Sequence, residues 1–174
     1  RVLFRSAIEG IVENLFEKFG ADNQTPMVVQ GDPGTGKTII AVYLIKLLVD
    51  IGSANLDDEL NHDSMFTDYF QPDYQEVFER AKIGLVIPQG ALRETIKKVF
   101  SKTPGLDKRM VMSQFEVGES EEEFDLLIVD EAHRLGQRAN QSSAAQNIKF
   151  HNINERLFGR DDDSYTQLDW IRSK

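Results

Sequence analysis

Hydrophobic residues near the start of the chain recur every three or four positions. This spacing places them on one face of an amphipathic helix. Gly20 follows the last of them, and glycine commonly ends a helix. The stripe predicts a helix that packs against a core, and it consists of Ile8, Ile11, Val12, Leu15, Phe16 and Phe19.

Short apolar runs alternate with helical patterns over the rest of the chain, which predicts βα units and a mainly parallel sheet. Met27–Val29 leads into a glycine-rich stretch and then a helix, Lys37–Val49, that is apolar on nearly all sides. Phe124–Val129 is continuously hydrophobic, as expected of a parallel strand covered on both faces. The other expected elements are strands at Ile83–Ile87 and Met110–Met112, helices at Ala91–Ser101, Asn147–Phe158 and Tyr165–Arg172, and an acidic turn at Glu116–Glu123.

Residues 52–79 interrupt this order with eight acidic residues and no Lys or Arg. Aromatic residues and a Met lie among them, which is compatible with short helices. We expect an acidic surface insertion in a single domain spanning residues 1–174, because a chain of this length suffices for one buried core.

The composition restricts the partners and the compartment. A net charge of -9 repels nucleic acid and anionic lipid, so a polyanionic partner must meet a local basic patch. The chain has no Cys, which excludes disulfides, thiol nucleophiles and Cys-ligated metal sites and fits a cytoplasmic protein. The longest apolar stretch, Ile39–Val49, contains Lys46 and is too short to cross a bilayer, so we expect no membrane segment.

The glycine-rich stretch fits the phosphate-binding pattern G-x-x-x-x-G-K-S/T. A flexible turn is the alternative, but here the pattern lies between an expected strand and an expected helix, where backbone N–H groups surround a phosphate. A side chain at Gly34 or Gly36 would block that approach. Lys37 offers a positive charge to the β/γ-phosphate oxygens, and Thr38 offers a hydroxyl to Mg²⁺. We therefore expect ATP and Mg²⁺ to bind at Gly31, Asp32, Pro33, Gly34, Thr35, Gly36, Lys37 and Thr38.

Asp130 and Glu131 follow the hydrophobic run at Phe124–Val129. A carboxylate at this strand end can reach Mg²⁺ beside the loop, which assigns Asp130 to the metal. Successive residues at a strand end diverge, so Glu131 can face the attacking water as the general base. Alternatively, both acids only solvate the strand end. His133 either senses the γ-phosphate or packs against the sheet.

The segment Arg80–Arg109 holds eight Lys or Arg against two acids, a local balance of +6. Such a concentration suits a groove that follows a DNA or RNA backbone, because phosphate contacts are local. A solvated helix face explains it equally well. The loop with Arg134, Arg138 and Asn140 is another candidate contact. The basic residues of the segment are Arg80, Lys82, Arg93, Lys97, Lys98, Lys102, Lys108 and Arg109.

Taken together, these motifs resemble the first motor domain of superfamily 1 DNA/RNA helicases. More narrowly, they resemble the Schlafen-group-3-like helicase-like ATPases over Gly31–Leu48, Ile83–Phe100 and Leu126–Gly159, most distinctively at Arg134–Gln141. The resemblance implies a three-layer, RecA-like P-loop fold and an ATP-hydrolysing motor. It places catalytic water on Glu131, Mg²⁺ on Thr38 and Asp130, and nucleic acid on the segment after Ile87.

The resemblance also implies parts that residues 1–174 do not contain. A further strand would follow the helix near Trp170 and lie between the Met27 and Leu126 strands, and a second RecA-like domain would supply arginine fingers. We therefore expect a piece of a longer protein, incomplete at its C-terminus. Two rival functions remain open: a nucleotide-operated regulatory or defence module that switches a protein partner without unwinding, and a catalytically idle half-domain.

Overall fold

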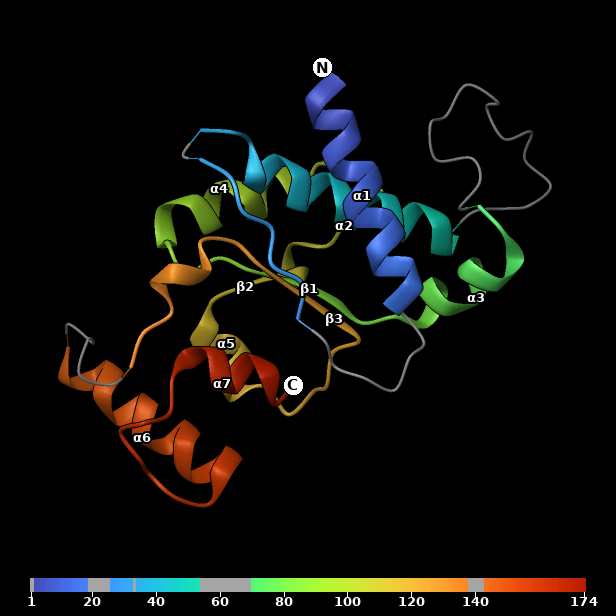
Figure 1. Ribbon diagram of the computed structural model, residues 1–174. Coiled ribbons are helices and arrows are strands. Elements are labelled where there is room, and N and C mark those ends of the chain that lie inside the picture. The colour runs from blue at the N-terminus through green and yellow to red at the C-terminus, as the bar shows by residue number, and fades with distance from the viewer. Residues whose placement is uncertain (1, 19–25, 33, 54–69, 138–142) are drawn as a thin grey trace.

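The computed structural model describes residues 2–18, 26–32, 34–53, 70–137 and 143–174. Its centre is a three-stranded parallel sheet in the order β2-β1-β3. The central strand β1 (Ile83–Val86) is fully buried, and β2 (Val111–Met112) and β3 (Leu126–Val129) flank it. Helices cover both faces, giving the expected three-layer α/β arrangement (Figure 1).

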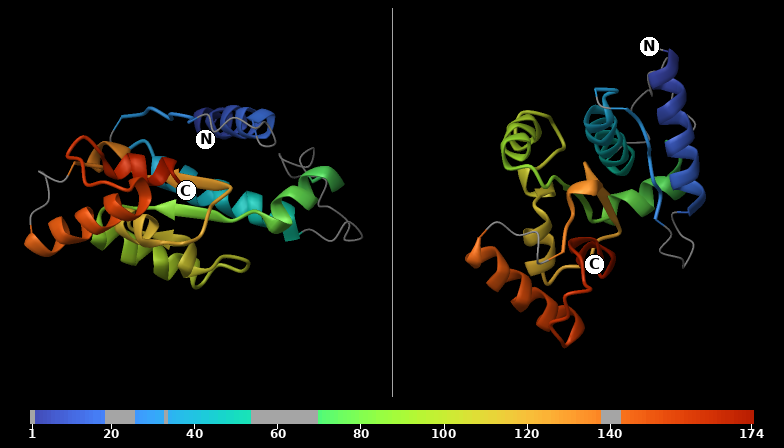
Figure 2. Two further views of the ribbon diagram at one scale, coloured as in Figure 1. Left: turned by 90° about the horizontal axis from the view of Figure 1, so that it is seen from below. Right: turned by 60° about the vertical axis from the view of Figure 1, so that its left-hand side comes forward.

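One face of the sheet packs against α2 (Lys37–Ser53) and α4 (Gly90–Phe100), and α1 (Val2–Lys18) packs against α2 (Figures 1 and 2). Alternate residues of β1 point to this face, as the two-residue period of a strand requires. The core here is entirely hydrophobic. Its fully buried members include Leu85 of β1 and Ile45 of α2.

The opposite face packs against α5 (Gln114–Glu119) and α7 (Gln167–Arg172). There Val86 of β1 forms one hydrophobic cluster with Val117 and Ile171. A third cluster joins α6 (Ala144–Phe158) to α7 through the buried ring of Trp170. The indole Nε1 of Trp170 donates a 2.8 Å hydrogen bond to Asn154, so this buried polar pair is satisfied.

Most predicted elements are confirmed to within a few residues at each end. The helix α6 begins one turn earlier than predicted because the Ser143 side chain accepts a hydrogen bond from Gln146 N and caps it. Thr166 and Asp169 form a capping box that starts α7 two residues later than predicted. Gly20, the predicted end of the first helix, lies outside the described residues.

The strand predicted at Met27–Val29 is wrong. This segment pairs with no described strand, and Val28 and Val29 are 78% and 47% exposed. In the expected fold another strand lies between this segment and β3, and the described residues supply none. Among the described residues, no strand therefore pairs with the backbone N–H and C=O groups of this segment. For the same reason β3 is only half-buried, although its sequence predicted cover on both faces.

The acidic turn predicted at Glu116–Glu123 is also wrong, because its first half is the helix α5. Ser113 and Glu116 form a capping box in which each side chain accepts a hydrogen bond from the other residue's backbone N–H. This S-x-x-E pattern is visible in the sequence and is typical of a helix start.

The acidic insertion is partly integrated into the core. Its last third is the helix α3 (Pro72–Arg80), with Phe78 buried against α2 and 5.1 Å from the Phe16 ring, centre to centre. Residues 54–69 lie outside the described part. The helices in the described ranges include none that is long and apolar enough to cross a membrane. Two short 3-10 helices, η2 (Lys108–Met110) and η3 (Ala132–Arg134), complete the elements.

The contact of α2 with α3 depends on the absence of a side chain at Gly52. A Cβ there would lie 2.6 Å from the backbone carbon of Phe78. Gly52→Ala should therefore lower the free energy of unfolding by about 1–3 kcal/mol, the usual cost of overpacking. The matched control is Gly10→Ala in α1, where a Cβ meets nothing within 4 Å and should stabilise by about 0.5–1 kcal/mol. Urea unfolding of both variants measures the difference, and equal effects would contradict the packing described.

Candidate nucleotide site

The phosphate-loop residues form a tight turn that leads directly into α2. Gly34 and Gly36 have φ angles of +80° and +86°, a region that residues with a Cβ rarely adopt. The Thr35 backbone N–H and hydroxyl both donate to the Asp32 carbonyl, at 3.3 and 2.8 Å. A Cβ at Gly31 would lie 2.9 Å from the Thr35 hydroxyl. The turn thus favours glycine at positions 34 and 36 through their backbone angles, and a side chain at Gly31 would displace the Thr35 hydroxyl. Pro33 lies outside the described residues.

The amino end of α2 presents backbone donors beside this turn. The first helical hydrogen bond runs from Ile40 N to the Gly36 carbonyl at 3.0 Å. The preceding N–H groups have no partner within the helix, and the helix dipole adds partial positive charge there. This arrangement suits a phosphate group.

The Lys37 side chain lies across the beginning of the loop. Its ammonium donates to the carbonyls of Gly31 and Asp32, at 2.7 and 2.9 Å. These contacts keep the positive charge next to the helix amino end. Lys37 is therefore placed where it would contribute to binding an anion.

A hydrogen bond joins the loop to the end of β3. Thr38 Oγ1 donates to Asp130 Oδ2 at 2.7 Å, although the residues are 92 positions apart in the chain. Asp130 is only 5% exposed, and its backbone N–H donates to the Val86 carbonyl at 3.0 Å, extending the pairing of β3 with β1. A hydroxyl and a carboxylate oxygen meet here, and both are ligand types that Mg²⁺ prefers.

The described residues contain no group of three or more acidic or His side chains able to hold a metal ion. Mg²⁺ usually binds through one or two carboxylates, with water and substrate phosphates as its other ligands. The Thr38–Asp130 pair beside the loop therefore fits a metal ion that arrives with a nucleotide.

Glu131 follows Asp130 but turns sharply away from the strand. Its backbone is left-handed, with φ 53° and ψ 45°, which is uncommon for a residue with a long side chain. Its carboxylate lies 3.2 Å from His133 Nδ1, and its side chain is 35% exposed. Unusual backbone geometry of this kind clusters at functional sites. Asp130 therefore contacts Thr38, whereas Glu131, after the turn, contacts His133.

His133 does not pack against the sheet, because its side chain is 72% exposed. That alternative is wrong, and His133 instead faces Glu131. The loop that follows is fixed by a residue the sequence did not indicate: Gln167 of α7 is 1% exposed, and its side chain accepts a 3.1 Å hydrogen bond from Gly136 N. Arg134 is exposed, and Arg138 and Asn140 lie outside the described residues.

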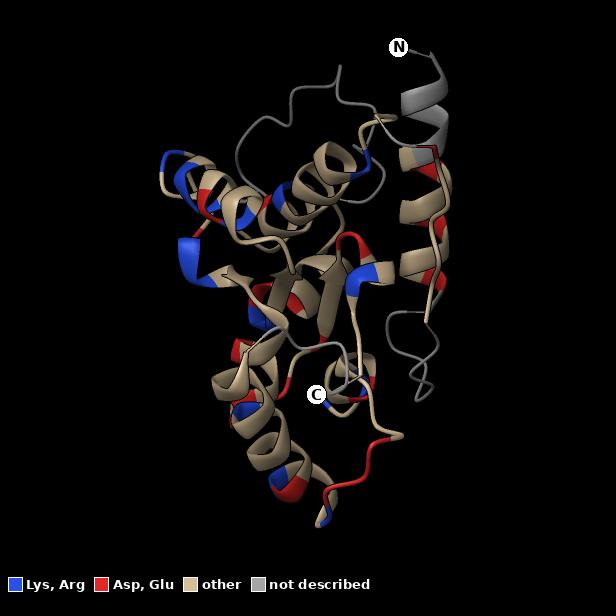
Figure 3. Cartoon of the chain, turned by 90° about the vertical axis from the view of Figure 1, so that its left-hand side faces the viewer, with Lys and Arg blue, Asp and Glu red and all other residues tan. Residues whose placement is uncertain are grey.

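The basic segment is less uniform in the structure than in the sequence. The Arg93 guanidinium donates to the Ile87 and Pro88 carbonyls, at 2.8 and 3.3 Å. Three further cations form ion pairs: Lys82 with Glu122, Lys97 with Glu94 and Glu116, and Arg109 with Asp107. Arg109 holds the pKa of Asp107 at about 2. The blue positions of α4 and η2 lie on the side of the molecule away from α1, with acidic positions of α4 among them (Figure 3).

Comparison with protein families matches residues 4–159 to the family described as type III restriction enzyme, res subunit. The match spans the phosphate loop, Asp130 and Glu131. No curated protein and no solved structure matches the chain. The matched family is a helicase-like ATPase domain of the superfamily 2 type, and it uses ATP and Mg²⁺ generally. The chain therefore belongs to the type III restriction enzyme res subunit family and is a helicase-like, NTP-binding P-loop domain.

Proposed function

We propose that this domain binds ATP with Mg²⁺, hydrolyses it, and acts as a motor on DNA or RNA. The observation that carries the proposal is the hydrogen bond from Thr38 to the buried carboxylate of Asp130. It brings a loop suited to phosphate and an acidic strand end into one site, as ATP-dependent P-loop proteins require.

Each group of the site has a part in this proposal. The loop N–H groups and Lys37 hold the phosphates, and Thr38 and Asp130 hold Mg²⁺. When bound, Mg²⁺ neutralises charge on the phosphate oxygens. Glu131 accepts the proton of the attacking water, and His133, 3.2 Å from that carboxylate, orients it and senses the γ-phosphate.

The nucleic-acid partner rests on the helicase-like family and on the segregated basic segment. The expected superfamily 1 assignment gives way to the superfamily 2 type of the matched family. The narrower resemblance to Schlafen-group-3-like ATPases rests only on the sequence around the two motifs and on Arg134–Gln141, and it stays a proposal. We also propose that a second RecA-like domain is a partner of this domain.

Replacing Lys37 tests the nucleotide site. Lys37→Ala should weaken ATP binding by ~10²–10³-fold, since a positioned charge in such a site contributes several kcal/mol. The matched control is Lys46→Ala, nine residues further along the same helix, where the lysine pairs with Asp50. Titration calorimetry of the purified, folded proteins compares them. Unchanged ATP affinity in Lys37→Ala would refute the phosphate-loop assignment.

Replacing Glu131 separates binding from chemistry. Glu131→Gln should keep ATP affinity but slow turnover by ~10²–10⁴-fold, the usual contribution of a positioned base. Asp130→Asn should instead raise the Mg²⁺ concentration needed for binding. Glu122→Gln, at an exposed ion pair, is the control for a lost carboxylate. Parental turnover in Glu131→Gln would exclude this residue as the base.

The motor role is tested by the dependence of ATPase activity on nucleic acid. We expect single-stranded DNA or RNA to raise the steady-state ATPase rate of the full-length protein. An ATPase rate that neither DNA nor RNA changes, but that a protein partner raises, would favour the regulatory switch.

A further inference from the structure

The segment 131–137 follows β3 and carries both Glu131 and His133. Its middle is the single turn of η3, and all three residues of that turn are exposed. A 3-10 turn of this length has weak hydrogen-bond geometry and does not fix its own place on the surface. The position of the Glu131 carboxylate therefore depends on how the two ends of the segment are attached.

Both ends are attached to buried parts of the fold. At the first end, the Asp130 N–H donates to the Val86 carbonyl at 3.0 Å. At the far end, the Gly136 N–H donates to the side-chain oxygen of Gln167, and the Gly136 carbonyl accepts from the Gln167 backbone N–H, both at 3.1 Å. Gln167 thus binds Gly136 through its side chain and through its backbone.

The Gln167 side chain is buried, with 1% of its surface exposed. Because Gly136 N is a donor, the amide oxygen must face it, and the amide Nε2 faces elsewhere. Nε2 is buried and has no hydrogen-bond partner in the described part of the chain. A buried donor without a partner is costly, so a side chain that only filled this space would be apolar. The part of Gln167 that the fold uses is the oxygen that meets Gly136.

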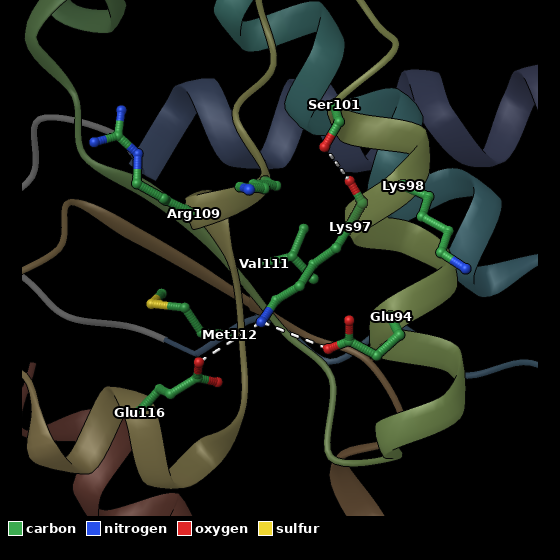
Figure 4. A pocket seen from close by; sticks show the side chains of 9 residues that line it. Glu94, Lys97, Lys98, Ser101, Arg109, Val111, Met112 and Glu116 are labelled. Carbon is green, nitrogen blue, oxygen red and sulfur yellow. Dashed lines mark hydrogen bonds and ion pairs between the residues drawn. The ribbon is translucent and has the colours of Figure 1, made fainter.

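The helix that carries Gln167 is a firm anchor for this bond. Trp170 of α7 is fully buried and packs so closely on α5 that a Cβ at Gly118 would lie 2.9 Å from its ring. α5 is linked in turn to α4, because the Lys97 ammonium lies 3.6 Å from the Glu116 carboxylate (Figure 4). Gln167 therefore ties the exposed segment to helices that are packed together on the sheet.

The backbone of Glu131 depends on this attachment. Its left-handed conformation, with φ 53°, persists in a residue with a long side chain only where the surroundings fix it. Without the Gln167 oxygen, the half-buried Gly136 N–H would have to turn toward water. That movement would release the far end of the segment, and Glu131 could relax to an ordinary backbone conformation.

We propose that Gln167 is a positioning residue for hydrolysis. By accepting the hydrogen bond from Gly136, it keeps the Glu131 carboxylate beside His133, in the orientation from which it takes a proton from the attacking water. The inference rests on the proposed function, in which Glu131 is the base, and it gives Gln167 no contact with the reacting atoms.

Two substitutions remove the oxygen from its place in the full-length protein. Gln167→Met keeps an unbranched side chain of similar length, and Gln167→Asn keeps the amide but is too short to reach Gly136. The matched control is Trp170→Phe, which removes the buried hydrogen bond to Asn154 from the same helix and leaves the Gly136 contact in place. Circular dichroism checks folding, and Gln167→Asn carries the test if Gln167→Met does not fold.

The first measurement does not need activity. Amide hydrogen exchange of Gly136, taken relative to that of the buried Leu85 amide, should be about tenfold faster or more in both Gln167 variants. Trp170→Phe should leave this ratio close to that of the parent, because exchange of the Leu85 amide corrects for any loss of global stability.

The second measurement is the steady-state ATPase rate. Both Gln167 variants should lower kcat about tenfold or more, since a base displaced by ~1 Å can lose up to 10²-fold in rate. KM for ATP and the affinity for a non-hydrolysable ATP analogue should stay within about twofold of the parent. Trp170→Phe should keep the parental kcat. In a Glu131→Gln background, Gln167→Met should have no further effect on kcat, because the base that it positions is already gone.

A parental kcat in both Gln167 variants would overturn the inference. An equal loss of kcat in Trp170→Phe, or a further loss on top of Glu131→Gln, would also overturn it, because each would show a general structural effect. A parent without ATPase activity, or parental turnover in Glu131→Gln, would instead refute the proposed function. In that case Gly136 exchange would still decide whether Gln167 holds the segment.

Discussion

The parallel pairing of β3 with β1 is the interaction on which the site depends. β1 is buried on all sides and gives its neighbours a fixed register, with Val86 opposite Val129. The pairing continues for one more hydrogen bond, from Asp130 N to the Val86 carbonyl. That bond determines where the Asp130 carboxylate lies, and α2, packed on the same core, brings Thr38 within 2.7 Å of it. Packing at the centre of the molecule therefore sets a geometry at its edge.

The net charge of the basic segment does not show which of its cations already have partners within the domain. The segment Arg80–Arg109 has a balance of +6, but several of its cations already bind carbonyls or carboxylates of the same domain. Glu116 both caps α5 and lies beside Lys97, so one side chain serves helix formation and interhelical pairing. Positive charge remains available at the end of α4, on the side of the sheet away from Asp130.

Sequence reasoning predicted the parts of the fold that local pattern controls. The periodicity of α1 and the apolar runs of α2 and β3 are strong local signals, and the glycine motif with Asp130 predicted which segments would meet. It failed where pairing depends on a distant neighbour, because Met27–Val29 has the sequence of a strand but pairs with none of the strands that the structure describes. The left-handed backbone of Glu131 and the pairing of Lys97 also depend on tertiary contacts, which no local pattern contains. The capping box of α5 was readable at Ser113 and Glu116.

We propose that Thr38 and Asp130 complete a site for ATP and Mg²⁺ at the amino end of α2. A crystal structure of the protein with a non-hydrolysable ATP analogue and Mg²⁺ tests it most directly. We expect phosphates against the loop N–H groups and a metal ion about 2.0–2.1 Å from Thr38 Oγ1, with Asp130 bound to it directly or through a water molecule. A nucleotide bound elsewhere, or a metal ion with neither residue in its coordination sphere, would contradict it.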